Sequence, residues 1–153
     1  MKLVCFNANS IRIRMHQLQA IIEKYEPDII GVQETKVADD AFPVSDIAAM
    51  GYHVQFHGQK THYGVCIISK QPLKNVQKGF PTDTDDAQRR FIVGEFEDET
   101  GQTVTILNGY FPQGENVDHE TKFPAKEKYY ADLQAFLNAS YTPNDRLIVM
   151  GDM

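Results

Sequence analysis

Four polar side chains that can bind a cation or a phosphate each follow an apolar stretch of strand length. They are Asn7 after residues 3–6, Glu34 after residues 29–32, Tyr110 after residues 103–107 and Asp152 after residues 147–150. In open α/β sheets, ligands bind beyond the carboxyl ends of the strands. Side chains two positions apart lie on the same face of a strand, so Asn7, Glu34 and Asp152 should point to the core side of their strand ends. We therefore expect these groups to meet at one end of a sheet.

Two carboxylates at such a position favour a metal ion. Glu34 and Asp152 would repel each other and resist burial unless a cation or a proton compensated their charge. Oxygen ligands from carboxylates, amides and water suit Mg²⁺ or Mn²⁺, which polarises a phosphoryl oxygen or lowers the pKa of a bound water. The alternative for either carboxylate alone is a helix cap or a turn residue. The coincidence of four strand-end positions favours the metal site.

Apolar runs bounded by turn residues predict strands. The runs are residues 3–6, 29–32, 52–56, 65–68, 91–96, 103–107 and 147–150. Helical spacing predicts a helix between the first two runs, a weaker short one at 44–50, and one at about 124–138 with Tyr129, Tyr130, Leu133, Phe136 and Leu137 on one face. The first helix makes its flanking strands a parallel pair, and the polar turn at 97–102 predicts a hairpin. The predicted class is α/β with a mixed sheet and no domain boundary.

Charge and composition narrow the class of protein. Fifteen Lys and Arg against 21 Asp and Glu give a net charge of −6, which argues against indiscriminate binding to nucleic acid but not against a nuclease with clustered metal-binding carboxylates. No apolar run approaches the about 20 residues of a membrane span, and the first apolar run is too short for a secretory signal. A cytoplasmic protein is therefore predicted. Cys5 and Cys66 lie in apolar runs without metal-binding spacing, which predicts buried, reduced thiols.

Several motifs resemble those of bacterial exonuclease III in order and spacing. The motifs are Gln33-Glu34-Thr35-Lys36, His57-Gly58-Gln59-Lys60, Ala87-Gln88-Arg89-Arg90, Asn108-Gly109-Tyr110-Phe111-Pro112-Gln113-Gly114, Phe123-Pro124-Ala125-Lys126 and Gly151-Asp152-Met153. The first and the last are shared across the wider endonuclease/exonuclease/phosphatase superfamily, whereas the second and the fourth point more narrowly to exonuclease III. The resemblance runs from Met1 to Met153 and covers somewhat more than half of the family domain.

The resemblance implies a fold and an activity. The fold would be half of a four-layered α/β sandwich, in which two mixed sheets pack face to face with helices outside, as in deoxyribonuclease I. The activity would be Mg²⁺-dependent hydrolysis of DNA phosphodiesters in base-excision repair, with Mn²⁺ as a possible substitute. The implied reactions are 3′-to-5′ exonuclease, abasic-site endonuclease and 3′-phosphatase. The implied partner is double-stranded DNA with abasic or 3′-blocked sites.

The same resemblance assigns roles to individual residues. Glu34 would be the principal metal ligand, and Asn7 would be an amide that either lies in the coordination shell of the metal or orients its ligands. Asp152 would be the general base for the attacking water, and Tyr110 would contact the scissile phosphate. Phosphate or substrate contacts are assigned to Arg90, Gln113 and Lys122, each of which has a solvated surface position as its alternative.

The family pattern continues beyond Met153 with an Asn, further aspartates and a terminal Asp-His pair. Residues 1–153 are therefore expected to be the amino-terminal portion of one domain, truncated after the Gly-Asp-Met strand end and inactive or nearly so alone. The full-length form is expected to be a monomer. Two alternatives remain: a self-associating half-domain without catalysis, because one sheet face would lack a cover, and another metal-dependent phosphodiesterase of the superfamily.

Overall fold

The computed structural model describes residues Met1–Met153 and contains eight strands and three α-helices. The strands are β1 (Leu3–Asn7), β2 (Ile29–Gln33), β3 (His53–His57), β4 (Val65–Ser69), β5 (Lys74–Lys78), β6 (Phe91–Glu97), β7 (Thr103–Gly109) and β8 (Leu147–Gly151). The helices are α1 (Met15–Tyr25), α2 (Val44–Ala49) and α3 (Lys122–Ser140), with 3₁₀ turns η1 (Ile11–Arg14) and η2 (Asp39–Ala41). No helix is long and apolar enough to cross a membrane.

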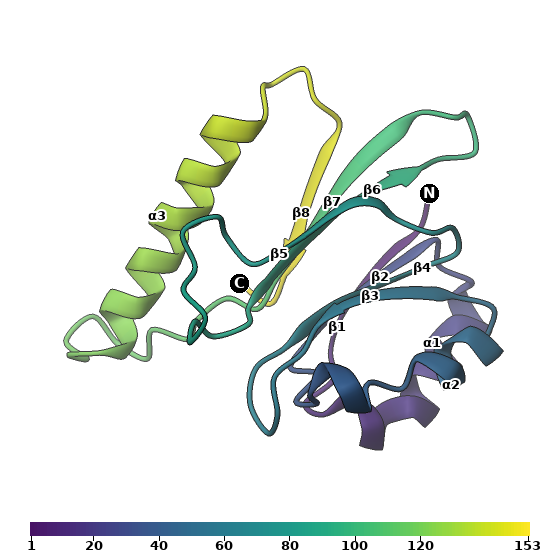
Figure 1. Cartoon of the computed structure of the whole chain (residues 1–153), viewed down its shortest axis with the longest axis horizontal. Helices are drawn as coiled ribbons and strands as arrows, with labels where there is room; N and C mark the ends of the chain where they lie inside the picture. Colours follow the sequence, from purple (N-terminus) through teal and green to yellow (C-terminus); the bar gives the residue numbers. More distant parts are fainter.

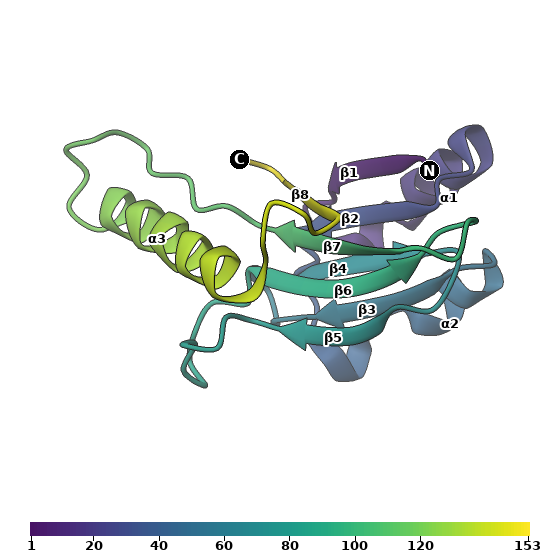
Figure 2. The same cartoon turned by 90° about the horizontal axis from the view of Figure 1, so that it is seen from above.

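The strands form two mixed four-stranded sheets, with orders β1-β2-β4-β3 and β5-β6-β7-β8. The predicted parallel pair is confirmed, since β1 and β2 run parallel with Asn7 opposite Gln33. The predicted hairpin of β6 and β7 is confirmed as well. A second parallel pair joins β7 and β8, with Gly109 opposite Gly151. Figure 2, seen from above, shows the two sheets lying one over the other with most of their strands running in similar directions. Asn7 at the end of β1 is hydrogen-bonded to Asp152 just after β8, so the carboxyl ends of both parallel pairs lie at one end of the molecule.

The elements stack in four layers, as the resemblance implies: α1 and α2, the first sheet, the second sheet, and α3 (Figure 1). Three apolar cores hold the layers together. One packs α1 and α2 on the first sheet, with Leu18, Ile47 and Cys66 among its buried members. The second fills the space between the sheets, and the third packs α3 on the second sheet. The layers bury the apolar faces that the sequence pattern predicts.

A buried polar link also joins the sheets. Asn108 of β7 donates from Nδ2 to the carbonyl oxygens of Val32 (3.0 Å) and Cys66 (2.9 Å) in the first sheet. Its Oδ1 accepts a hydrogen bond from Gln33 Nε2 at 2.6 Å. Asn108 and Gln33 are both 0% exposed. Because buried polar groups are expensive unless they are paired, this link fixes how the sheets face each other just below the strand ends.

Three details differ from the sequence prediction. Strand β5 was not predicted, because its residues Lys74–Lys78 are mostly polar and it lies at a sheet edge, where burial is weak. Cys66 is buried and reduced as predicted, but the prediction for Cys5 is wrong: its free thiol is exposed, because β1 is also an edge strand. Tyr130 was predicted on the buried face of its helix and is instead 40% exposed.

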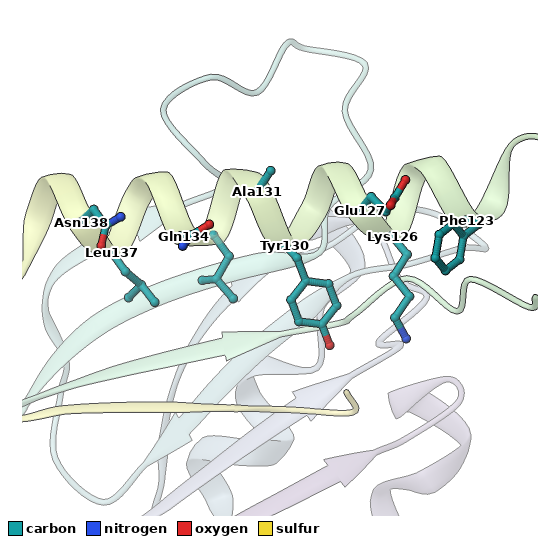
Figure 3. Close-up of a pocket in the computed structure, with 9 residues that line it drawn as sticks. Phe123, Lys126, Glu127, Tyr130, Ala131, Gln134, Leu137 and Asn138 are labelled. Carbon is teal, nitrogen blue, oxygen red and sulfur yellow. The ribbon is translucent and has the colours of Figure 1, made fainter. Parts of the chain in front are cut away.

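Tyr130 lies along an open groove of about 730 Å³ beside α3. Figure 3 shows its ring in this groove with the side chains of Phe123 and Leu137. Every residue that lines the groove belongs to α3, and none is a predicted site residue.

Candidate active site

Three polar side chains from three strand ends are joined by hydrogen bonds. Asn7 ends β1, and its Nδ2 donates to Glu34 Oε1 at 2.9 Å and to Asp152 Oδ2 at 2.6 Å. The Oδ1 of Asn7 accepts from the backbone N–H of Asn9 at 3.1 Å, which fixes the orientation of the amide. The Oδ1 of Asp152 accepts from the backbone N–H of Phe111 at 3.2 Å. One amide therefore holds a carboxylate from each sheet.

The two carboxylates have different electrostatic surroundings. Burial alone would raise the pKa of Glu34, but hydrogen bonds from Asn7 and Lys36 outweigh it and hold that pKa below its usual range. For Asp152 the desolvation is stronger, and it raises the pKa despite the hydrogen bonds from Asn7 and Phe111; the charge of Glu34 adds to the rise. Glu34 is thus the more stable anion, while Asp152 binds a proton more readily.

Tyr110 follows β7 and faces Glu34. Burial and the nearby Glu34 carboxylate raise the pKa of the Tyr110 phenol, so this group stays a hydrogen-bond donor at neutral pH. The guanidinium of Arg90 lies over the Tyr110 ring, 4.4 Å from its centroid, and Arg90 Nη1 donates to the Tyr110 carbonyl at 3.2 Å. A phenol donor and a cation therefore lie beside the carboxylate pair.

The loops that carry these groups are bonded to one another through their backbones. Ser10 N–H donates to the carbonyl of Glu34 at 2.8 Å, and Lys36 N–H donates to that of Tyr63 at 2.9 Å. On the other side, Gly64 N–H donates to Arg89 O at 2.9 Å, and Tyr110 N–H donates to Arg90 O at 2.7 Å. Five segments from both sheets are thus joined in one continuous chain of backbone hydrogen bonds.

Several residues of these loops have positive φ angles, which residues other than glycine rarely adopt. Glu34 has φ +53°, Lys36 +52° and Tyr63 +57°. Such conformations are unfavourable for residues other than Gly, and they cluster at functional sites in proteins. The clustering at this end of the molecule supports a functional site here rather than a set of ordinary turns.

The profile of the Endonuclease/Exonuclease/phosphatase family matches residues 4–153. The chain belongs to this family. It is 56% identical over 153 residues to exodeoxyribonuclease III of Haemophilus influenzae, and the match covers all of this chain and 57% of that protein. The predicted resemblance is confirmed.

Solved structures of the family have the same fold. A 3′ phosphatase from Neisseria bound to product DNA hairpin matches with a TM-score of 0.89 and 35% identity, over 99% of this chain and 57% of that one. An AP endonuclease from Archaeoglobus fulgidus matches with a TM-score of 0.88 and 32% identity, over 99% and 56%. The chain thus spans little more than half the length of the family members it matches.

The family is metal-dependent, and the donor atoms of the cluster fit a hard divalent cation in part. No group of three His, Cys, Asp or Glu side chains in the chain is arranged so that it could hold a metal ion by itself. The cluster offers only the carboxylate oxygens of Glu34 and Asp152, and Mg²⁺ characteristically binds one or two carboxylates with water and phosphate oxygens filling the rest of its octahedron. A cation here would also offset the desolvation and the repulsion from Glu34 that together raise the pKa of Asp152. Asn7 donates to both carboxylates, which is the geometry of an orienting amide.

The remaining predicted residues lie apart from the cluster. Gln113 is exposed in the loop between β7 and α3. Lys122 is the first residue of α3, and its ammonium pairs with Glu115. Lys36, in contrast, was not predicted as a site residue, and its ammonium lies 3.0 Å from Glu34 Oε2 and 2.6 Å from Asn9 Oδ1. Its place two residues after Glu34 in a family motif was the only signal in the sequence.

Proposed function

We propose that this chain supplies the amino-terminal part of a Mg²⁺-dependent DNA phosphodiesterase of the exonuclease III type. The observation that carries the proposal is the single amide of Asn7 that holds Glu34 and Asp152 at one strand-end site, beside the phenol of Tyr110. The proposed substrate is double-stranded DNA with an abasic site or a blocked 3′ end. Support for this substrate comes from the family members: one is a 3′ phosphatase bound to product DNA hairpin, and another is an AP endonuclease.

Each side chain of the site would have a separate role in hydrolysis. Glu34, the more stable anion, would hold the Mg²⁺ ion, with Mn²⁺ as a substitute; when bound, the ion would polarise a phosphoryl oxygen. Asp152, whose pKa is raised, would accept the proton of the attacking water. The Tyr110 phenol would donate a hydrogen bond to a non-bridging phosphate oxygen. The water oxygen would bond to phosphorus as the phosphorus–oxygen bond to the leaving group breaks.

Arg90, Gln113 and Lys122 would contact the DNA backbone. Arg90 is already ordered beside Tyr110, so its guanidinium can meet the phosphate that the phenol contacts. Lys122 would exchange its pairing with Glu115 for a phosphate, and the exposed Gln113 would contact the strand nearby. None of these contacts reads base sequence, which fits an enzyme that recognises a lesion or an end.

The test compares this chain alone with a joined protein, in which the chain is followed by the part of H. influenzae exodeoxyribonuclease III beyond the match. The substrates are a duplex with one abasic-site analogue and a duplex with a 3′-phosphate, each with Mg²⁺ or EDTA. We expect cleavage by the joined protein with Mg²⁺ only, and a rate for the chain alone that is lower by about 10³-fold or more, because residues of a catalytic unit act together.

The control separates the proposed ligand from an ordinary acid. In the joined protein, Glu34→Gln should lower the Mg²⁺-dependent rate by about 10³-fold. Glu99→Gln changes an exposed carboxylate in the β6–β7 turn and should leave the rate unchanged. If the joined protein cleaves neither substrate, the proposed function is wrong. If Glu34→Gln cleaves as fast as Glu99→Gln, the assignment of Glu34 is wrong.

A further inference from the structure

Tyr63, in the loop between β3 and β4, adds a second aromatic ring to the stack on Arg90. The Arg90 guanidinium carbon lies 4.7 Å from the centroid of the Tyr63 ring and 4.4 Å from that of Tyr110. The two rings are 6.4 Å apart and inclined by 42°. Both rings therefore contact the guanidinium from neighbouring directions, an arrangement in which cation–π attraction favours a fixed position.

Hydrogen bonds fix the same guanidinium in its plane. Its Nε donates to Gln88 Oε1 at 2.7 Å, and its Nη1 donates to the Tyr110 carbonyl at 3.2 Å. No hydrogen bond within the chain uses its Nη2. A half-buried arginine is therefore held by two aromatic rings and by hydrogen bonds along one edge, while the remaining edge keeps donors for an external acceptor.

The backbone of Tyr63 explains how its ring reaches this place. With φ +57°, Tyr63 adopts the left-handed region that non-glycine residues rarely occupy. Its carbonyl accepts from Lys36 N–H, and the next residue, Gly64, donates to Arg89 O. The loop is thus tied to the segment after Glu34 on one side and to the segment before Arg90 on the other.

We propose that Tyr63 is a positioning residue, which acts through Arg90 by holding its guanidinium against Tyr110 with one edge presented to a DNA phosphate. This inference rests on the proposed function. The physical gain is preorganisation: a free arginine side chain loses rotamer freedom when it binds a phosphate, and the stack removes that loss beforehand. Tyr63 itself need not touch the DNA.

The first test detects the contact between Tyr63 and Arg90 by NMR and needs no cleavage assay. In the 153-residue chain labelled with ¹⁵N, the Arg90 Nε–Hε resonance should be shifted by the ring currents of two tyrosines. Tyr63→Phe keeps a π-face and should leave this resonance close to its position, whereas Tyr63→Leu has similar bulk without a π-face and should move it toward the free-arginine value. An Arg90 resonance that is the same in all three proteins overturns the proposal.

The second test asks whether Tyr63 acts through Arg90. In the joined protein, Tyr63→Leu should raise KM for the abasic-site duplex about fivefold, the size of one cation–π contact, with kcat within about twofold. Tyr63→Phe should restore KM. In an Arg90→Ala background, Tyr63→Leu should add nothing, because there is no guanidinium left to hold.

The outcomes separate this inference from the proposed function. A full additional loss for Tyr63→Leu in the Arg90→Ala background would mean that Tyr63 acts independently, and the inference would be wrong. A loss confined to kcat would contradict it too. If the joined protein cleaves nothing, the proposed function fails, and the Arg90 resonance still decides whether Tyr63 holds the guanidinium. If Tyr63→Leu does not fold, Tyr63→Phe against Tyr63→His, which has a weaker π-face, decides in its place.

Discussion

The buried link between the sheets makes a prediction that can be worked from the structure. Replacing Asn108 by Ala removes three buried hydrogen bonds, two donated to Val32 O and Cys66 O and one accepted from Gln33. At about 1 kcal/mol each, their loss costs about 3 kcal/mol. The Gln33 amide loses its shortest hydrogen bond, and the cavity left by the Asn108 side chain adds about 1–2 kcal/mol to the loss of stability. Asn108→Ala should therefore destabilise the chain by about 4–5 kcal/mol, a large share of the about 5–15 kcal/mol typical of a domain.

Urea unfolding followed by circular dichroism measures this difference. Thr105→Val is the matched control: Thr105 is also a buried polar residue of β7, but its side chain makes no hydrogen bond to the other sheet. That control should change the free energy of unfolding by less than about 1 kcal/mol. A loss for Asn108→Ala as small as that of the control would refute the view that Asn108 fixes the sheets, and with them the spacing of Glu34 and Asp152.

Three further predictions concern pH, backbone conformation and association. Because the folded pKa of Asp152 lies above its ordinary value of 3.8, the unfolded chain binds fewer protons between these two pKa values, and stability falls as pH rises through this window. Asp152→Asn should thus be more stable than the native chain at pH 7 and lose that advantage below pH 3.8. If the thermal midpoints of the two proteins are equal at both pH values, the pKa shift is contradicted. Gly64→Ala should destabilise the chain by about 3 kcal/mol in urea unfolding, because its Cβ would meet Thr35 Oγ1 at φ +89°, whereas Gly101→Ala, with φ +76° and open space, should cost only about 1 kcal/mol. The edge strands β1 and β8 lie on the same side of the two sheets, so sedimentation velocity of the chain alone should show association that increases with concentration; a strict monomer would argue against pairing at these edges.

Much of the fold follows from the sequence because its strands are apolar. The predicted runs locate seven strands to within a few residues at their ends, and the helical spacing locates the three α-helices. Strand β5 carries Lys74 and Lys78 and has no such pattern, so only tertiary pairing with β6 makes it a strand. Cys5 was wrongly predicted to be buried for a related reason: an apolar run identifies a strand but does not reveal that the strand lies at the edge of its sheet.

The candidate site was predictable where it depends on strand ends and not where it depends on loops. Asn7, Glu34 and Asp152 follow strands in the sequence and meet in space. Lys36 and Tyr63 reach the site through left-handed backbone conformations and contacts between distant loops, which no local pattern encodes. Gln113 and Lys122 came from the resemblance alone, and their roles remain proposals.

The most direct measurement of the central claim, that Glu34 holds a divalent cation at the strand ends, is a Mn²⁺ titration of the ¹⁵N-labelled chain. Paramagnetic Mn²⁺ should first broaden the amide resonances nearest the cluster, those of Ala8, Thr35 and Phe111, and excess Mg²⁺ should compete. Glu34→Gln should abolish this selective broadening, while Glu99→Gln should preserve it. Broadening centred on the acidic loop at residues 83–86, or unchanged in Glu34→Gln, would contradict the claim.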